Sequence, residues 1–324
     1  MREIRYLRAV IEALEQEMAR DKNVFVMGED VRLSVKGATT GLVDKFGSDR
    51  VIDTPISEQA LCGSAIGAAI MGFRPVIEFH TPEFVFFAFD QLVDQAQKLR
   101  YMSGGRLKIP ITYLVTGSGA GGSSAAQHSD HAYPYVLQGG MKVIIPSTPF
   151  DVKGLLIGAI RDDDPVMVFL PARILAMKGD VPEDIYSIPL GSGEVKHQGK
   201  DVTVVATGHL VQIAVNLAKK LEADGISIEI FDPRSLLPLD LKMLKESVKK
   251  TGRVVIFDDS NKKCGFASDV AAILAEECFS WLKAPVKRIA RADVPVPFSP
   301  PLENYMLPNE EKLISSITNV LRWR

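Results

Sequence analysis

The sequence predicts an α/β protein built from two doubly wound domains. Short apolar runs alternate with segments of helical periodicity along most of the chain, and this alternation pauses once, between residues 171 and 200. Short, continuous apolar strands that alternate with helices are typical of parallel sheets covered on both faces. The length of 324 residues suits two domains at roughly 150 residues each. We therefore expect one domain at residues 1–185 and a second at residues 186–324.

The first block begins with an amphipathic helix. Leu7, Val10, Ile11, Leu14 and Met18 share one helical face, and the short apolar run at residues 24–27 predicts a strand. The same patterns then predict helices at 58–71, 86–101 and 151–161, and strands at 75–79, 109–115, 142–145 and 166–169.

The second block follows a segment rich in glycine and proline, which is typical of a linker. Its apolar runs and helical periodicities predict strands at 202–206, 226–231, 254–257 and 286–289, and helices at 210–223, 241–249, 266–281 and 310–320.

The composition narrows the possible partners. Lys and Arg total 38 against 40 Asp and Glu, a net charge of -2, so there is no excess of basic charge to bind nucleic acid. The longest apolar stretch, residues 60–73, contains glycines and is shorter than the roughly 20 residues that cross a bilayer, so we expect a buried helix and no membrane contact. The N-terminal residues lack a signal-type apolar segment, which favours a cytoplasmic location.

The segment Gly117–Gly122 matches the G-x-G-x-x-G pattern and follows a predicted strand, so an NAD-linked oxidoreductase is one interpretation. Residues 123–135 do not have a convincing helical pattern, however, and no acidic residue follows where a ribose hydroxyl would need one. The other interpretation is a loop whose glycines adopt positive φ.

A second polar loop contains His128, Asp130 and His131. Two imidazoles and a carboxylate within four residues could begin a metal site. A single catalytic histidine on a loop after a strand, or polar residues without a role, are the alternatives.

Glu58 stands at the start of the glycine- and alanine-rich helix, after Pro55 and Ser57, which suit a turn and a helix cap. One interpretation is a carboxylate favoured by the helix dipole. The other is a buried carboxyl with a raised pKa, which suits proton transfer.

Several motifs together resemble the β subunit of the thiamine-diphosphate-dependent E1 component of 2-oxo acid dehydrogenase complexes. They occur in the same order over nearly the whole chain, at residues 28–31, 50–58, 72–79, 101–105, 126–129, 146–149, 233–240 and 301–303. Within this family, the segments at 125–128, 264–265 and 297–300 look most similar to acetoin dehydrogenase β subunits.

The resemblance implies a thiamine-diphosphate-binding (pyrimidine-type) domain followed by a transketolase C-terminal-like domain, in an α2β2 heterotetramer with E1 α subunits. In this family the α subunit holds the diphosphate and Mg²⁺ through a Gly-Asp-Gly motif, which this chain lacks. The implied reaction is cleavage of acetoin or oxidative decarboxylation of a small 2-oxo acid such as pyruvate. The acyl or aldehyde unit then passes to the lipoyl group of an E2 acyltransferase.

The resemblance also assigns individual residues. Glu58 matches the glutamate that hydrogen-bonds the aminopyrimidine ring and activates the cofactor, Phe84 matches the aromatic residue against that ring, and Glu29 matches a glutamate near the cofactor. His128 matches the histidine that handles protons during transfer to the lipoyl group. A potassium site is implied at Ile111, Ala159, Asp162 and Asp164.

Three segments near His128 depart from the family pattern, at residues 114–117, at Asp130 and at residues 139–142. The substrate therefore stays open among acetoin, pyruvate, branched-chain and other 2-oxo acids. A non-catalytic scaffold that docks an E2 subunit through Lys262 and Lys263 is the remaining alternative.

Overall fold

The computed structural model describes residues 1–121 and 124–323, which fold into two compact units. The first unit comprises Met1–Gly119 and Tyr135–Leu190, and the second comprises Ala120–Pro134 and the chain from Gly191 onward. The sequence places the boundary at residue 185, five residues before the observed one, and does not indicate that residues 120–134 belong to the second unit. A single boundary position cannot describe a chain that enters the second unit at residue 120 and returns to the first at residue 135.

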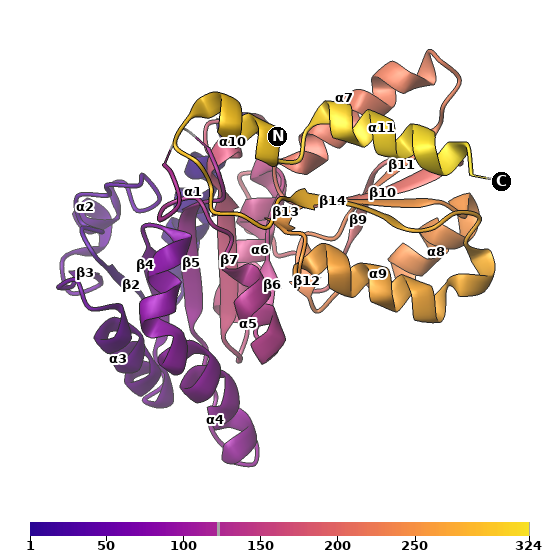
Figure 1. Cartoon of the computed structure of the whole chain (residues 1–324). Helices are drawn as coiled ribbons and strands as arrows, with labels where there is room; N and C mark the ends of the chain where they lie inside the picture. The colour runs from indigo at the N-terminus through magenta and orange to yellow at the C-terminus, as the bar shows by residue number, and fades with distance from the viewer. Residues whose placement is uncertain (122–123, 324) are drawn as a thin grey trace. The chain divides into compact units, whose positions relative to one another are not determined.

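The first unit is built on a parallel sheet (Figure 1). Its strands, in spatial order, are β6 (Lys142–Ile144), β7 (Val166–Pro171), β5 (Thr112–Ser118), β4 (Arg74–Phe79), β2 (Val24–Gly28) and β3 (Val51–Asp53). The strands expected from apolar runs are confirmed within a few residues, because strands covered on both faces need apolar side chains throughout. Glu78, inside β4, is an exception to this pattern and is nevertheless buried.

Helices α1 (Tyr6–Arg20) and α6 (Pro149–Arg161) pack against each other and share a core with β2 and β7. Helix α3 (Glu58–Ile70) packs against β4 and the 3₁₀ segment η1 (Pro82–Ala88). The remaining elements of this unit are α2 (Leu42–Phe46), α5 (Tyr133–Gly139), η3 (Ala172–Ile174) and the antiparallel pair β1 (Arg2–Arg5) and β8 (Lys178–Val181).

Two expectations for this unit are wrong. The helix expected at 86–101 is η1, then a π-helical turn η2 (Asp90–Ala96), then α4 (Gln97–Met102). Apolar periodicity alone does not distinguish these kinds of turn, and Pro82 starts the first of them. The helix expected to be buried is buried on one face only: Leu61 and Ala65 are buried, whereas Ile70 is 43% exposed.

The second unit contains the parallel strands β14 (Lys287–Arg291), β13 (Val254–Asn261), β10 (Val202–Ala206) and β11 (Ile228–Asp232), with β9 (Glu194–His197) antiparallel at the edge. Figure 1 shows α7 (Leu210–Glu222) and α11 (Glu310–Leu321) on one face, and α8 (Leu241–Thr251) and α9 (Phe266–Glu277) on the other. The shorter elements are β12 (Ser235–Leu237), η4 (Phe279–Trp281) and α10 (Pro300–Met306).

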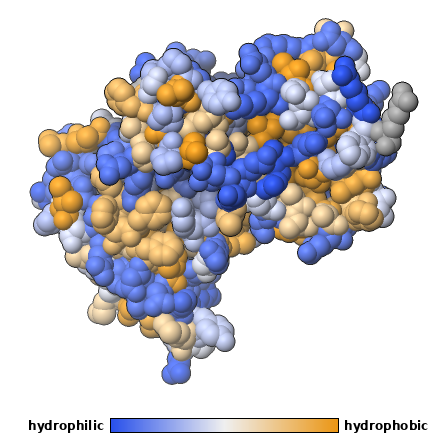
Figure 2. Space-filling view, in the orientation of Figure 1, coloured by the Kyte–Doolittle hydropathy of each residue, from blue (hydrophilic) through white to orange (hydrophobic). Residues whose placement is uncertain are grey.

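Two surface features bear on partners. Among the described residues, no helix is both long and apolar enough to cross a membrane. Figure 2 shows apolar side chains gathered on part of the surface of the first unit. Phe86 and Phe87 of η1 are exposed. Tyr101 and Met102, at the end of α4, are also exposed.

Candidate active site

Polar residues of the first unit that could take part in catalysis lie at the carboxyl ends of β2 and β4. In open α/β sheets, ligands bind beyond the carboxyl ends of the strands. Gly28 ends β2 in register with Glu78 of β4, and a Cβ atom at position 28 would stand 2.7 Å from the Glu78 carbonyl oxygen. Only glycine therefore lets the two strands approach at the point where Glu29 follows. Asp30 then turns the chain in the left-handed region, with φ of 46°.

Glu58 is the first residue of α3 and is 7% exposed. The Ser57 side chain makes no capping hydrogen bond, so the expected serine cap is wrong, although the Ser57 carbonyl accepts the first helical bond, from Leu61 N, at 2.9 Å. One turn further on, burial and the nearby Glu58 charge raise the pKa of the Cys62 thiol, which stays protonated.

Glu29 and Glu58 come together from different elements. Burial raises the pKa of Glu29, and the charges of Glu58 and Asp30 raise it further. Negative groups in such an arrangement disfavour ionising together. The Glu29 carboxyl can therefore hold a proton at a higher pH than it would alone in water.

Phe84 lies on η1, which packs against α3, so the aromatic ring and Glu58 stand on neighbouring elements. The Phe84 ring is half-buried, and its centroid lies 6.4 Å from that of Phe87. An apolar ring beside a buried carboxyl suits a flat heteroaromatic group that carries a basic nitrogen.

Two further groups were not predicted as site residues. Glu78 Oε2 lies 3.4 Å from His80 Nε2, and both side chains are largely buried. The sequence around His80 contains no motif that indicates a partner for its imidazole. The signal for Glu78 was available, since an acidic residue interrupts an otherwise apolar strand.

His128 belongs to the second unit, on an exposed loop, and Glu58 belongs to the first. The loop is anchored by the residues that follow it. Arg291 Nη1 donates to the Ser129 carbonyl at 2.8 Å, His131 Nε2 lies 2.9 Å from Asp259 Oδ2, and Tyr133 donates to Asp258 at 2.7 Å. These anchors leave the His128 side chain directed to solvent.

The His131 contact determines the state of Asp259. Burial by itself would raise the pKa of this carboxyl, but the hydrogen bond and charge of His131, with the charges of His209 and Arg291, lower it to about 2. Asp130 faces Arg291 instead, at 3.2 Å. The metal-site interpretation of this loop is therefore wrong, and no metal-binding group of three His, Cys, Asp or Glu residues occurs within the ranges described.

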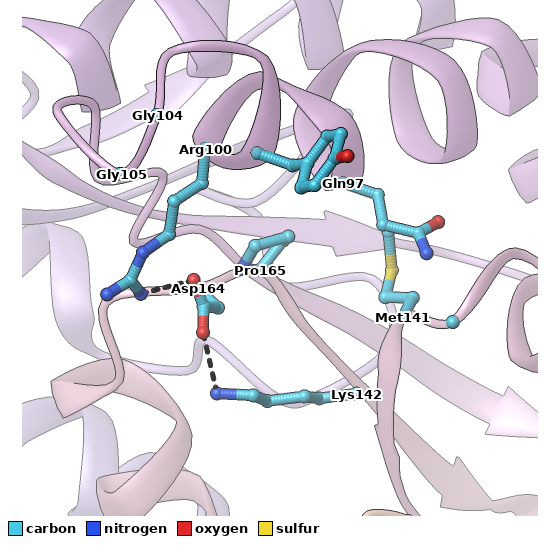
Figure 3. Close-up of a pocket in the computed structure, with 10 residues that line it drawn as sticks. Gln97, Arg100, Gly104, Gly105, Met141, Lys142, Asp164 and Pro165 are labelled. Atoms are coloured by element: carbon cyan, nitrogen blue, oxygen red, sulfur yellow. Dashed lines mark hydrogen bonds and ion pairs between the residues drawn. The ribbon is translucent and has the colours of Figure 1, made fainter.

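Asp162 and Asp164 lie at a different place in the first unit, where Asp164 lines a cavity of about 520 Å³ (Figure 3). Lys142 Nζ contacts Asp162 Oδ1 at 2.8 Å and Asp164 Oδ2 at 3.0 Å, and Arg100 also pairs with Asp164. The carboxylates are thus neutralised by side chains and do not suit a metal ion. The Ile111 and Ala159 carbonyls accept one backbone hydrogen bond each, which leaves a second lone pair on each oxygen.

The glycine loop after β5 contains Gly117 and Gly119 at φ of 83° and 84°, as the loop interpretation requires. Gly122 lies outside the described residues. The next described helix, α5, begins only at Tyr133, so no helix N-terminus is present there to bind a pyrophosphate. The NAD interpretation is wrong.

Comparison with known proteins agrees with this arrangement. Residues 2–177 match the pyrimidine binding domain of transketolase, and residues 191–313 match the transketolase C-terminal domain. A solved structure described as a split-gene transketolase, an inactive β4 tetramer, superimposes with a TM-score of 0.81 at 25% identity and covers 99% of both chains.

Three curated relatives match almost end to end. The chain is 44% identical to the β subunit of acetoin:2,6-dichlorophenolindophenol oxidoreductase of Bacillus subtilis, over 97% of this chain and 96% of the relative. It is 41% identical to the 2-oxoisovalerate dehydrogenase β subunit of the same species, over 95% of each. It is 42% identical to the pyruvate dehydrogenase E1 β subunit of Rickettsia bellii, over 96% and 97%. The chain belongs to the family of β subunits of thiamine-diphosphate-dependent E1 dehydrogenases.

Proposed function

We propose that this chain is the β subunit of an E1 enzyme that cleaves acetoin or oxidatively decarboxylates a small 2-oxo acid, and that it passes the product unit to a lipoyl group of E2. The observation that carries the proposal is the buried Glu58 carboxyl beside Glu29 on the pyrimidine-binding unit. The relatives named for acetoin, 2-oxoisovalerate and pyruvate differ by only a few per cent in identity, so the substrate must be measured.

The residues present fit the aminopyrimidine half of thiamine diphosphate. When bound, the cofactor supplies a nucleophilic carbon and an electron sink. Glu58 would hold a proton at its carboxyl toward a ring nitrogen, and Glu29, whose own pKa is raised, would be a second carboxyl beside it that can hold a proton. Phe84 would fix the plane of the ring. His128 would hold a proton for the transfer to the acceptor.

The other half of the site requires an α subunit, which would hold the diphosphate and Mg²⁺. The chain contains no Gly-Asp-Gly segment, and the similar split-gene transketolase chain is described as inactive as a β4 tetramer. The exposed apolar side chains of Met71, Phe87 and Met102 are suited to burial against another subunit. We expect an α2β2 enzyme, and the cytoplasmic location stays a prediction.

The substrate is tested by assembling the chain with an α subunit that carries Gly-Asp-Gly. Acetoin, pyruvate and 2-oxoisovalerate are compared, with thiamine diphosphate and Mg²⁺, by kcat/KM with 2,6-dichlorophenolindophenol and with a lipoyl domain as acceptors. We expect turnover of at least one substrate with both acceptors. A correctly assembled enzyme that turns over none of the three would contradict the proposal, and docking of E2 without turnover would favour the scaffold alternative.

For potassium, we propose binding through the carbonyl oxygens of Ile111, Ala159, Asp162 and Asp164, since the two carboxylates are occupied by Lys142. KCl should then raise the Tm relative to tetramethylammonium chloride at equal ionic strength. Asp164→Asn should lower the Tm in both salts and leave the difference between them unchanged. If the Tm difference between the two salts disappears in this variant, the Asp164 carboxylate is a potassium ligand. If the parent chain shows no Tm difference between the salts, the proposed potassium site is contradicted.

A further inference from the structure

Near Glu29, the first unit contains a buried glutamate, Glu78, and a largely buried histidine, His80. The proposed mechanism gives neither residue a role. The Glu78 side chain is 3% exposed and the His80 side chain 14%. Glu78 Oε2 lies 3.4 Å from His80 Nε2. In the part of the chain that the structure describes, Glu78 Oε1 has no hydrogen-bond partner. A buried carboxylate oxygen without a partner is costly, whereas a protonated carboxyl is not.

The polar and charged groups that act on this pair come from two segments. Glu29, Asp30 and Lys36 lie in the loop after β2, and the Thr116 hydroxyl stands on β5. Burial raises the pKa of Glu78 to about 7. Thr116 and Lys36 lower it, and Glu29 raises it. Burial lowers the pKa of His80, while the Glu29 backbone and Asp30 raise it and Lys36 lowers it. The lowered pKa of His80 favours the neutral imidazole, and the Glu78 carboxyl exchanges its proton near neutral pH.

We propose that Glu78 and His80 are positioning residues that hold a titratable proton beside Glu29, and that they thereby set how strongly the Glu29–Glu58 pair keeps its own proton. The inference rests on the role proposed for Glu58. When Glu78 releases its proton, its negative charge stabilises the protonated form of the neighbouring pair. The pair then remains protonated above the pH at which it would otherwise ionise, and cofactor activation is sustained on the alkaline side of neutrality.

The first measurement needs no cofactor. Histidine labelled with ¹³C at Cε1 gives a resonance for each of the five histidines of the full chain, and His80→Gln identifies that of His80. We expect the His80 shift to report an inflection near pH 7 that comes from Glu78. The inflection should disappear in Glu78→Gln and persist, displaced, in Glu78→Asp. A wild-type His80 resonance without any inflection between about pH 6 and 8 overturns the proposal.

The second measurement uses the α2β2 enzyme with thiamine diphosphate, and follows exchange of the cofactor C2 proton at pH 6 and pH 8. The ratio of the pH 8 rate to the pH 6 rate should fall about tenfold in Glu78→Gln, as for a change of one pKa unit in the pair. Glu78→Asp should restore most of the ratio. An equal fall of the C2 exchange rate at pH 6 and pH 8 in both variants would contradict the proposal and assign Glu78 a purely structural role. Failure of the enzyme to bind thiamine diphosphate would count against the proposed function and leave the His80 titration standing.

Discussion

At the scale of single residues, the Glu58 carboxyl is the group on which we propose that cofactor activation depends. It is buried at the start of α3 beside a second carboxyl, whose pKa is raised. Glu58→Gln keeps the shape and cannot exchange a proton, so C2 exchange of bound thiamine diphosphate should slow by at least about 10²-fold. NMR of the assembled enzyme measures this rate. An unchanged rate in a variant that still binds the cofactor would remove the role of Glu58.

His128 is expected to act in the second half of the reaction. His128→Ala should leave the Kd for thiamine diphosphate within a few-fold, while acylation of a lipoyl domain falls by about 10²-fold or more. An artificial electron acceptor bypasses that transfer, so dye reduction should decrease less. The measured quantity is the ratio of the two activities in variant and parent. An unchanged ratio contradicts the transfer role, even if both activities fall.

Only some residues of the candidate site could be predicted from the sequence. Glu29 and Phe84 were assigned only by the family resemblance, whereas Glu58 was also indicated by its place at the start of a predicted helix. The sequence signals Glu78 as an acidic residue inside an apolar strand, but a pattern along the chain does not show that its side chain lies beside His80.

At the scale of elements, apolar runs identified the buried strands of both sheets, because those strands are covered on both faces. Edge strands and short connecting helices do not contain a continuous apolar run. The three-residue strand β3 and the helix α5 were therefore missed, and the turn types between residues 82 and 102 were not distinguished. The bond between His131 and Asp259 joins residues 128 positions apart, which no local periodicity reveals.

That bond should stabilise the loop before α5. Asp259→Asn removes a buried partner of His131 and should lower the free energy of unfolding by about 3 kcal/mol at pH 7. The matched control is Glu222→Gln, which removes the half-exposed partner of His197 in the same unit and should cost less than about 1 kcal/mol. Denaturant unfolding of the full chain measures both values.

The effect of Asp259→Asn should also depend on pH. The pKa of Asp259 is about 2 in the folded chain and about 3.9 when unfolded, so its contribution is complete above the unfolded value and is lost as the pH falls toward 2. The difference between variant and parent should therefore shrink between pH 4 and pH 2. A difference of the same size at both ends of that interval would show that the bond to His131 is not its source.

At the scale of the whole molecule, the chain is expected to be half of an active site. It carries residues suited to the pyrimidine ring and lacks the Gly-Asp-Gly segment for the diphosphate. Exposed apolar side chains on η1 and α4 offer surface for another subunit. The central claim is therefore that catalysis needs two different chains.

Thiamine-diphosphate-dependent turnover by the purified chain, with and without an α subunit, tests that claim most directly. Acetoin, pyruvate and 2-oxoisovalerate are assayed with dye at saturating cofactor and Mg²⁺, and mass spectrometry verifies that no second polypeptide is present. We predict no cofactor-dependent turnover by the chain alone, and its appearance when the α subunit is added at equal molar amounts. Cofactor-dependent turnover by a preparation that contains this chain only would contradict the claim.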